Sequence, residues 1–243
     1  MLVVSGASTV PAVAAAAIDA LVPRLAALEE VSIVISPGNG FDPGPATTRS
    51  ILSTLGRPLA AGAGSRSPPM HGWQGLRRVM IPGLGARWAS TCETPDLDLL
   101  PQRYPGLAHV EVLAALEVGA FHLGLWGLSW LVRAGVVRSP ERLAAPLLTL
   151  KRALRFLGSD AGGMMVTLVG KDCRGRRQRL VWRLIARRGH GPYIPGVPSL
   201  VLARRLIAGT LAARGATPCL GLLTLEEVLA EVADLDMTAG VIA

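Results

Sequence analysis

Polar side chains that could hold or protonate a small molecule gather in two loops of the first third of the chain. The first loop contributes Asn39, Asp42, Thr48 and Arg49, and the second contributes His71, Trp73, Gln74, Arg77 and Arg78. An arginine guanidinium can bind a carboxylate through two parallel hydrogen bonds, and an imidazole can move a proton near neutral pH. The sequence therefore predicts that these two loops form a substrate-binding surface.

Structural roles would explain several of the same residues equally well. Arg49 could pair with Asp42 across its own loop, and Trp73 could be a core side chain. The loop at 37–45 holds three glycines and three prolines, so its shape is strongly constrained and it could be a well-made turn that binds nothing. The sequence leaves both interpretations open.

The remaining reactive residues are too scattered to form a familiar hydrolytic or metal site. The four histidines are His71, His109, His122 and His190. No GxSxG or HExxH segment accompanies them, and the three cysteines lie far apart without a CxxC pair. This pattern argues against a structural metal and for a reducing, cytoplasmic location. The first nine residues lack the basic segment of a secretory signal.

A formal charge of +8 could indicate an anionic partner. Nearly all of the positive charge is arginine, because only Lys151 and Lys171 are lysines, and this bias weakens the case for nucleic acid. One row of arginines alternates along a predicted strand and comprises Arg177, Arg179, Arg183 and Arg187. No aromatic side chain interleaves this row, so we expect a solvated outer face and no nucleic-acid partner.

The first loop needs a strand and a helix to position it. Residues 31–36 form a β-branched apolar run, and residues 46–55 show helical spacing. The loop at 37–45 therefore lies at the carboxyl end of a predicted strand, which is where open α/β sheets usually hold ligands.

The rest of the chain alternates irregularly between strand and helix patterns. Helices are predicted at 9–28, 118–135, 139–157, 199–214 and 224–235, and strands at 110–116, 163–171 and 176–188. The last two strands form a hairpin. Because strict β-α alternation is missing, the predicted fold class is α+β, a mixed sheet with a helical layer in a single domain over 1–243.

The segment at 118–132 is apolar and contains no charged residue. Its 15 residues fall short of the roughly 20 needed to span a bilayer. We expect a buried or interface helix, with attachment to a membrane surface as the alternative.

Five short motifs follow one another in the order of a known family. They are Ser5-Gly-Ala-Ser-Thr-Val-Pro11, Ile35-Ser-Pro-Gly-Asn39, Gly72-Trp-Gln-Gly-Leu-Arg-Arg78, Pro82-Gly-Leu-Gly-Ala-Arg-Trp88 and Gly158-Ser-Asp-Ala-Gly-Gly-Met164. Together they resemble the bacterial saccharopine dehydrogenase-like proteins. The resemblance covers nearly the whole chain, but it matches only the part that follows the nucleotide-binding domain of that family.

The resemblance implies an N-terminal Rossmann domain that holds NAD(P) and a second α+β domain that shapes the substrate site and the dimer contact. In this chain the first domain is absent or reduced to residues 1–30, the tail end of a preceding α/β cofactor domain. Ser5, Gly6 and Ser8 are then the residues expected to bind the cofactor. The turn Pro82-Gly-Leu-Gly85 lacks the third glycine of a dinucleotide fingerprint, so no NAD(P) is expected to bind this chain alone.

Two hypotheses follow. The first is a substrate-binding and dimerisation portion of an NAD(P)-dependent oxidoreductase, present as a fragment, a split gene or a late start codon, with a small-molecule substrate and a homodimeric state. The second is a non-catalytic binding or scaffolding protein that self-associates, or attaches to a membrane surface, through the helix at 118–132.

Overall fold

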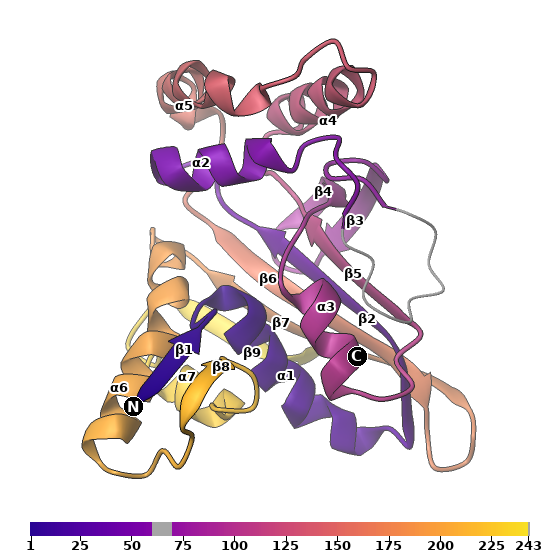
Figure 1. Cartoon of the computed structure of the whole chain (residues 1–243), viewed down its shortest axis with the longest axis vertical. Helices are drawn as coiled ribbons and strands as arrows, with labels where there is room; N and C mark the ends of the chain where they lie inside the picture. The colour runs from indigo at the N-terminus through magenta and orange to yellow at the C-terminus, as the bar shows by residue number, and fades with distance from the viewer. Residues whose placement is uncertain (60–69, 243) are drawn as a thin grey trace.

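A curved mixed sheet runs through the centre of the protein (Figure 1). The structure, a computed structural model, describes residues 1–59 and 70–242. Within these residues the sheet has seven strands in the order β3 (Arg77–Ile81), β4 (Gly85–Thr91), β5 (His109–Ala114), β2 (Ala27–Ser36), β6 (Gly162–Lys171), β7 (Arg177–Ala186) and β9 (Met237–Ile242). The β2–β5 pair is parallel, and the other neighbours are antiparallel. The predicted α+β class with a mixed sheet and a helical layer is confirmed.

The first face of the sheet carries the main core. Ile33, Val166 and Trp182 lie side by side across β2, β6 and β7, and all are nearly inaccessible to solvent. Four helices cover them: α1 (Ala14–Leu21), α3 (Asp96–Arg103), α6 (Val197–Ile207) and α7 (Leu225–Ala230). Side chains from all four helices belong to the same apolar cluster, so this face is closed by packing.

The second face is covered only in part, because the sheet curls and brings the β3–β4 hairpin over it. Ile81 and Ala89 of this hairpin pack with Met165, Val181 and Ile185 in a smaller apolar cluster. The arginine row of β7 was predicted to lie on a mostly wet face. The hairpin explains why Val181 and Ile185, which interrupt that row, are buried.

Three helices form a separate layer at one end of the sheet, at the top of Figure 1. They are α2 (Gly44–Ser53), α4 (Gly119–Arg133) and α5 (Ala144–Ala153). Leu52, Leu55, Trp73 and Ala144 form the core of this layer. None of the helices among the described residues is both long and apolar enough to cross a membrane.

A small parallel sheet joins two distant segments, β1 (Leu2–Ser5) and β8 (Gly215–Pro218). After β1 the chain passes through a short irregular helical segment, Thr9–Val13, into α1. Three predicted helices end earlier than expected by more than a turn. The first stops at Leu21 and passes into a 3₁₀ turn that contains Pro23. The second, α6, stops at Ile207 shortly before Gly209, which has φ +67°, and the third, α7, stops at Ala230.

Candidate functional site

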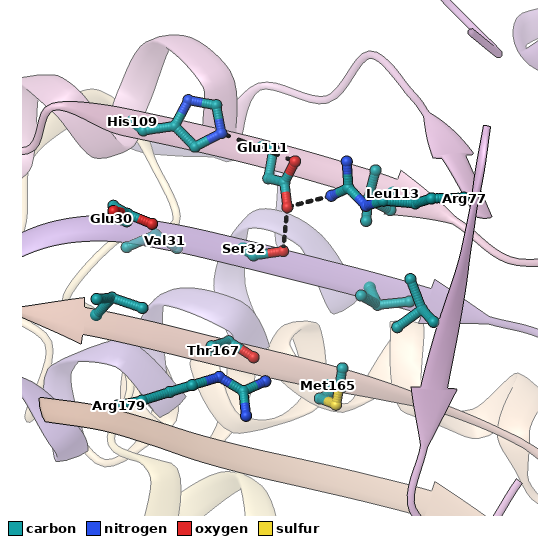
Figure 2. A pocket seen from close by; sticks show the side chains of 13 residues that line it. Glu30, Val31, Ser32, Arg77, His109, Glu111, Leu113, Met165, Thr167 and Arg179 are labelled. Carbon is teal, nitrogen blue, oxygen red and sulfur yellow. Dashed lines mark hydrogen bonds and ion pairs between the residues drawn. The ribbon is translucent and has the colours of Figure 1, made fainter. Parts of the chain in front are cut away.

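A groove of about 270 Å³ opens on the second face of the sheet, beside the β3–β4 hairpin (Figure 2). The residues that line it are Glu30, Val31, Ser32, Val34, Arg77, Val79, His109, Glu111, Leu113, Met165, Thr167, Val169 and Arg179. Strand register explains this gathering. Glu111, Ser32 and Thr167 are partners across β5, β2 and β6, and residues in register point to the same side of a sheet.

Glu111 is the centre of the polar part of the groove. Its carboxylate accepts a hydrogen bond of 2.7 Å from Ser32 Oγ and another from the guanidinium of Arg77. His109 Nε2 lies 3.7 Å from the second carboxylate oxygen. Burial alone would raise the pKa of Glu111, but the hydrogen bonds from Arg77 and Ser32 outweigh burial and hold this pKa below its ordinary value. The group is therefore a carboxylate with a fixed orientation.

The opposite side of the groove is formed by β6 and β7 and carries Thr167, Met165 and Arg179 (Figure 2). Arg179 is exposed, and its guanidinium makes no hydrogen bond or ion pair with the described residues. The groove thus offers a fixed carboxylate on one side and an available cation on the other, over a floor of hydroxyl and apolar groups. Such a lining can orient a small polar molecule. The described residues contain no cluster of side chains that could hold a metal ion.

Of the residues predicted to face a substrate, Arg77 lies in this groove. Asn39 lies elsewhere and has a structural role. It is 5 % exposed, its side-chain nitrogen donates to the carbonyl oxygens of Leu154 and Arg155, and its main-chain nitrogen donates to Glu117 at 2.7 Å. These bonds tie the loop to the chain that follows α5.

Asp42 lies just before α2 and Arg49 lies within it, and neither residue lines the groove. Asp42 forms an ion pair of 2.7 Å with Arg152, and the alternative pairing with Arg49 was wrong. The hydrogen bond from Arg152 is the main cause that lowers the pKa of Asp42. Arg49 is exposed and has no ionic partner among the described residues.

Trp73 and Gln74 belong to the interior rather than to a binding surface. Trp73 is 2 % exposed and packs against His122 with ring centroids 5.3 Å apart, so the core alternative holds for this residue. Gln74 is 6 % exposed and accepts a hydrogen bond of 2.6 Å from Arg133. The main-chain oxygen of His71 accepts a bond from Thr91. The 71–74 part of the second predicted loop is therefore held mainly by internal contacts, whereas Arg77 and Arg78 are exposed.

Ser5, Gly6 and Ser8 lie at the carboxyl end of β1, where the chain turns toward α1. The turn between β1 and α1 does not fit a dinucleotide pyrophosphate, which needs a glycine-rich turn and free N–H groups at a helix start. The N–H of Ser8 already donates to Gly6, that of Val13 donates to Ser8, and Pro11 has no N–H. A contact between these residues and a cofactor held by another domain stays a prediction.

The sequence interpretation missed His109, Glu111, Ser32, Thr167 and Arg179 as a group. The one sequence pattern that could have indicated these residues is the placement of polar side chains at every second position of an apolar strand, as for His109 and Glu111. The pairing of β5 with β2 and of β2 with β6 brings these positions together, and such register is hard to read from one sequence.

The fold has counterparts among solved structures. No protein-family model and no curated protein matches the chain. Among 24 matching structure chains is apo histidine-tagged saccharopine dehydrogenase (L-Glu forming) from Saccharomyces cerevisiae. It has a TM-score of 0.57 and 10 % sequence identity, over 95 % of this chain and 71 % of the yeast chain. At this identity the likeness concerns the fold alone. The chain therefore has a fold that is distantly similar to that of saccharopine dehydrogenase.

Proposed function

We propose that this chain is the substrate-binding and dimerisation portion of a saccharopine dehydrogenase-like, NAD(P)-dependent oxidoreductase. The observation that carries the proposal is the fold likeness to saccharopine dehydrogenase, which extends over 95 % of this chain. The order of the five sequence motifs supports it independently, because those motifs resemble the same family.

The groove on the second face of the sheet supports a role in holding a polar small molecule. Arg77 and Ser32 keep Glu111 ionised and oriented, and Arg179 offers a cation across the groove. We expect the chain to bind its substrate through such groups rather than through a metal ion. No catalytic residue is assigned.

Hydride transfer requires a nicotinamide beside the substrate, and that chemistry belongs to the cofactor. The turn after β1 offers few free N–H groups to a pyrophosphate, and the sequence lacks a three-glycine fingerprint. In the proposed enzyme a separate nucleotide-binding domain would supply NAD(P), and this chain would be inactive without it.

The proposal is tested by comparing the chain with its genomic context. The DNA upstream of the Met1 codon is translated in frame and searched for a strand followed by G-x-G-x-x-G, and neighbouring genes are searched in the same way. NADPH and NADH are then titrated by calorimetry into the 243-residue chain and into the extended or combined protein. We expect saturable binding of NADPH or NADH only to the extended or combined protein. Tight binding to the chain alone, or no cofactor domain in either place, would overturn the proposal.

A second candidate function is a non-catalytic scaffold that self-associates or attaches to a membrane surface through α4. One observation favours it: Leu123, Trp130 and Leu131 of this helix are 39 %, 44 % and 47 % exposed. Exposed apolar surface on a helix is usually covered by a partner. Sedimentation with and without liposomes separates the cases, and a monomer that stays in the supernatant would eliminate this candidate.

A further inference from the structure

We propose that Arg183 and Arg187 form a clamp for a small oxyanion, a molecule that carries a phosphate or carboxylate group, with Arg179 beside it on the same strand. Arg179 and Arg183 share the second face of β7, and Arg187 directly follows this strand at the same even spacing. Trp182 and Leu184, at intervening positions, are buried on the first face. This proposal does not depend on the oxidoreductase function.

The first observation is a contrast between neighbouring arginines. Three arginines near the ends of β7 have carboxylate partners: Arg176 pairs with Asp172, Arg177 with Glu30, and Arg188 with Asp236. Within the described part of the chain, Arg179, Arg183 and Arg187 have no acidic partner and no side-chain hydrogen bond. Three positive charges on one face therefore lack compensation.

The second observation is that two of these groups converge. A Cβ atom placed on Gly83, at the turn between β3 and β4, would lie 3.2 Å from Nη1 of Arg183 and 3.8 Å from Nη2 of Arg187. Both guanidinium groups thus lie beside the same glycine. Because Gly83 has no side chain, it does not cover them. Two like charges that approach the same point repel each other, and a bound anion would reduce this repulsion.

The surroundings favour a small ligand over a nucleic acid. Single-stranded nucleic acids need aromatic side chains on which bases stack. The aromatic residue of β7, Trp182, is 1 % exposed and faces the opposite side of the sheet. Planar guanidinium groups match the geometry of phosphate and carboxylate oxygens, and two of them can hold one such group from two directions.

The test uses the full chain and three probes, namely inorganic phosphate, pyrophosphate and citrate, titrated by calorimetry at low salt. The double variant Arg183→Gln/Arg187→Gln should weaken pyrophosphate binding at least about tenfold, because charged hydrogen bonds of this kind are lost. The matched control is Arg176→Gln/Arg177→Gln, which removes the same charge from arginines that already have partners. We expect it to change the affinity less than about twofold, since only the long-range field differs. Circular dichroism confirms that both variants fold.

Three results would overturn the clamp. One is no binding of any of the three anions to the wild-type chain. Another is an equal loss in the control variant, which would mean a general charge effect. The third is a single-stranded oligonucleotide that binds more tightly than pyrophosphate, which would replace the small ligand with a nucleic-acid surface. None of these results would affect the proposed cofactor dependence.

Discussion

His122 of α4 is a buried imidazole that the fold keeps neutral. Burial lowers its pKa from 6.5 to about 4. Nδ1 accepts from the N–H of Leu116, so Nε2 carries the proton and donates to Ser90 Oγ at 2.9 Å. The unfolded chain binds a proton below pH 6.5, whereas the native protein resists it until about pH 4. We expect His122 to remove up to about 1.4 kcal/mol of stability per pH unit as the pH falls through this window.

Urea unfolding at several pH values from 7 to 4.5 checks this prediction. The variant His122→Gln cannot titrate, so its stability should fall less with acid than that of the wild type. Equal pH slopes in the two proteins would show that the native imidazole titrates as it does in the unfolded chain.

Asp96, at the start of α3, should stabilise the protein as the pH falls, which is the opposite of the effect of His122. Both of its carboxylate oxygens are buried, and neither has a hydrogen-bond partner of normal geometry among the described residues. Burial raises its pKa from 3.8 to about 6, against smaller opposing effects of Thr94 and of its own main chain. The native protein therefore binds this proton before the unfolded chain does, and stability is gained as the pH falls from 6 to 3.8. Asp96→Asn should raise the free energy of unfolding at pH 7.5 by about 2 kcal/mol, because it removes a buried charge. A less stable variant at that pH would mean that the ionised carboxylate has a stabilising partner.

The cysteines differ in their access to solvent and in their acidity. Burial, with the negative charge of Asp96, raises the pKa of Cys92 to about 12, and burial raises that of Cys219 to about 11. Cys173 is exposed. A thiol reagent such as Ellman's reagent should label one cysteine in the native protein and all three in urea. Cys173→Ser should abolish the native reaction, and labelling that persists in this variant would contradict the assignment.

At the level of elements, the end of α2 meets α4 at a glycine. Gly56 has φ +66°, and a Cβ atom there would lie 2.2 Å from the carbonyl oxygen of Ser129. Gly56→Ala should therefore cost about 2 to 4 kcal/mol, from the unfavourable φ and from the forced separation of the two helices. Gly175→Ala is the control, because Gly175 has φ +75° with open space around it. Urea unfolding of both variants separates the two contributions, and equal losses would mean that the contact with Ser129 relaxes freely.

The sequence predicted those elements whose patterns are local. The β6–β7 hairpin, α2, α4 and the capping box of Thr224 and Glu227 lie where local rules place them. The strands β4, β8 and β9 and the helix α3 were not predicted, and for β8 and β9 the reason is that partners from distant segments stabilise them. For example, β8 pairs with β1 more than 200 residues away in sequence.

The candidate site was less predictable than the fold. Asn39 and Trp73 have residue types that suit ligand binding, but the structure uses them to join segments and to fill the core. Arg77 was predicted to face a substrate and does line the groove, although its partner Glu111 was not foreseen. The polarity of a residue does not tell whether its side chain makes a buried structural hydrogen bond or is accessible to a ligand, because this depends on tertiary contacts.

At the level of the whole molecule, one polar junction links the three-helix layer to the sheet. Glu117 accepts hydrogen bonds from the main chain of Asn39 and from Ser159, and it lies 3.6 Å from the guanidinium of Arg87. The Arg87 side chain is only 5 % exposed and also donates to Ser36. Burial alone would raise the pKa of Glu117, but these contacts together hold it below its ordinary value.

Glu117→Ala should cost about 3 kcal/mol, because it leaves Arg87 buried without its carboxylate and frees two main-chain donors. Hydrogen exchange should show lost protection at residues 36–41 and 158–162, on both sides of the junction. Glu93→Ala removes an exposed carboxylate and should change stability by less than about 0.5 kcal/mol. Unchanged protection in the Glu117 variant would show that apolar packing alone holds the layer in place.

The central position of β2 has a consequence for protein synthesis. Its two neighbours, β5 and β6, emerge from the ribosome long after it, and the sheet cannot close on its first face before β7 is made. At bacterial or eukaryotic translation rates, the wait from β2 to β7 lasts roughly ten to thirty seconds. Until β5 is made this apolar, β-branched segment has neither of its neighbours to pair with, and until β6 is made it has only one. The nascent chain is therefore expected to need a chaperone until the β6–β7 hairpin appears.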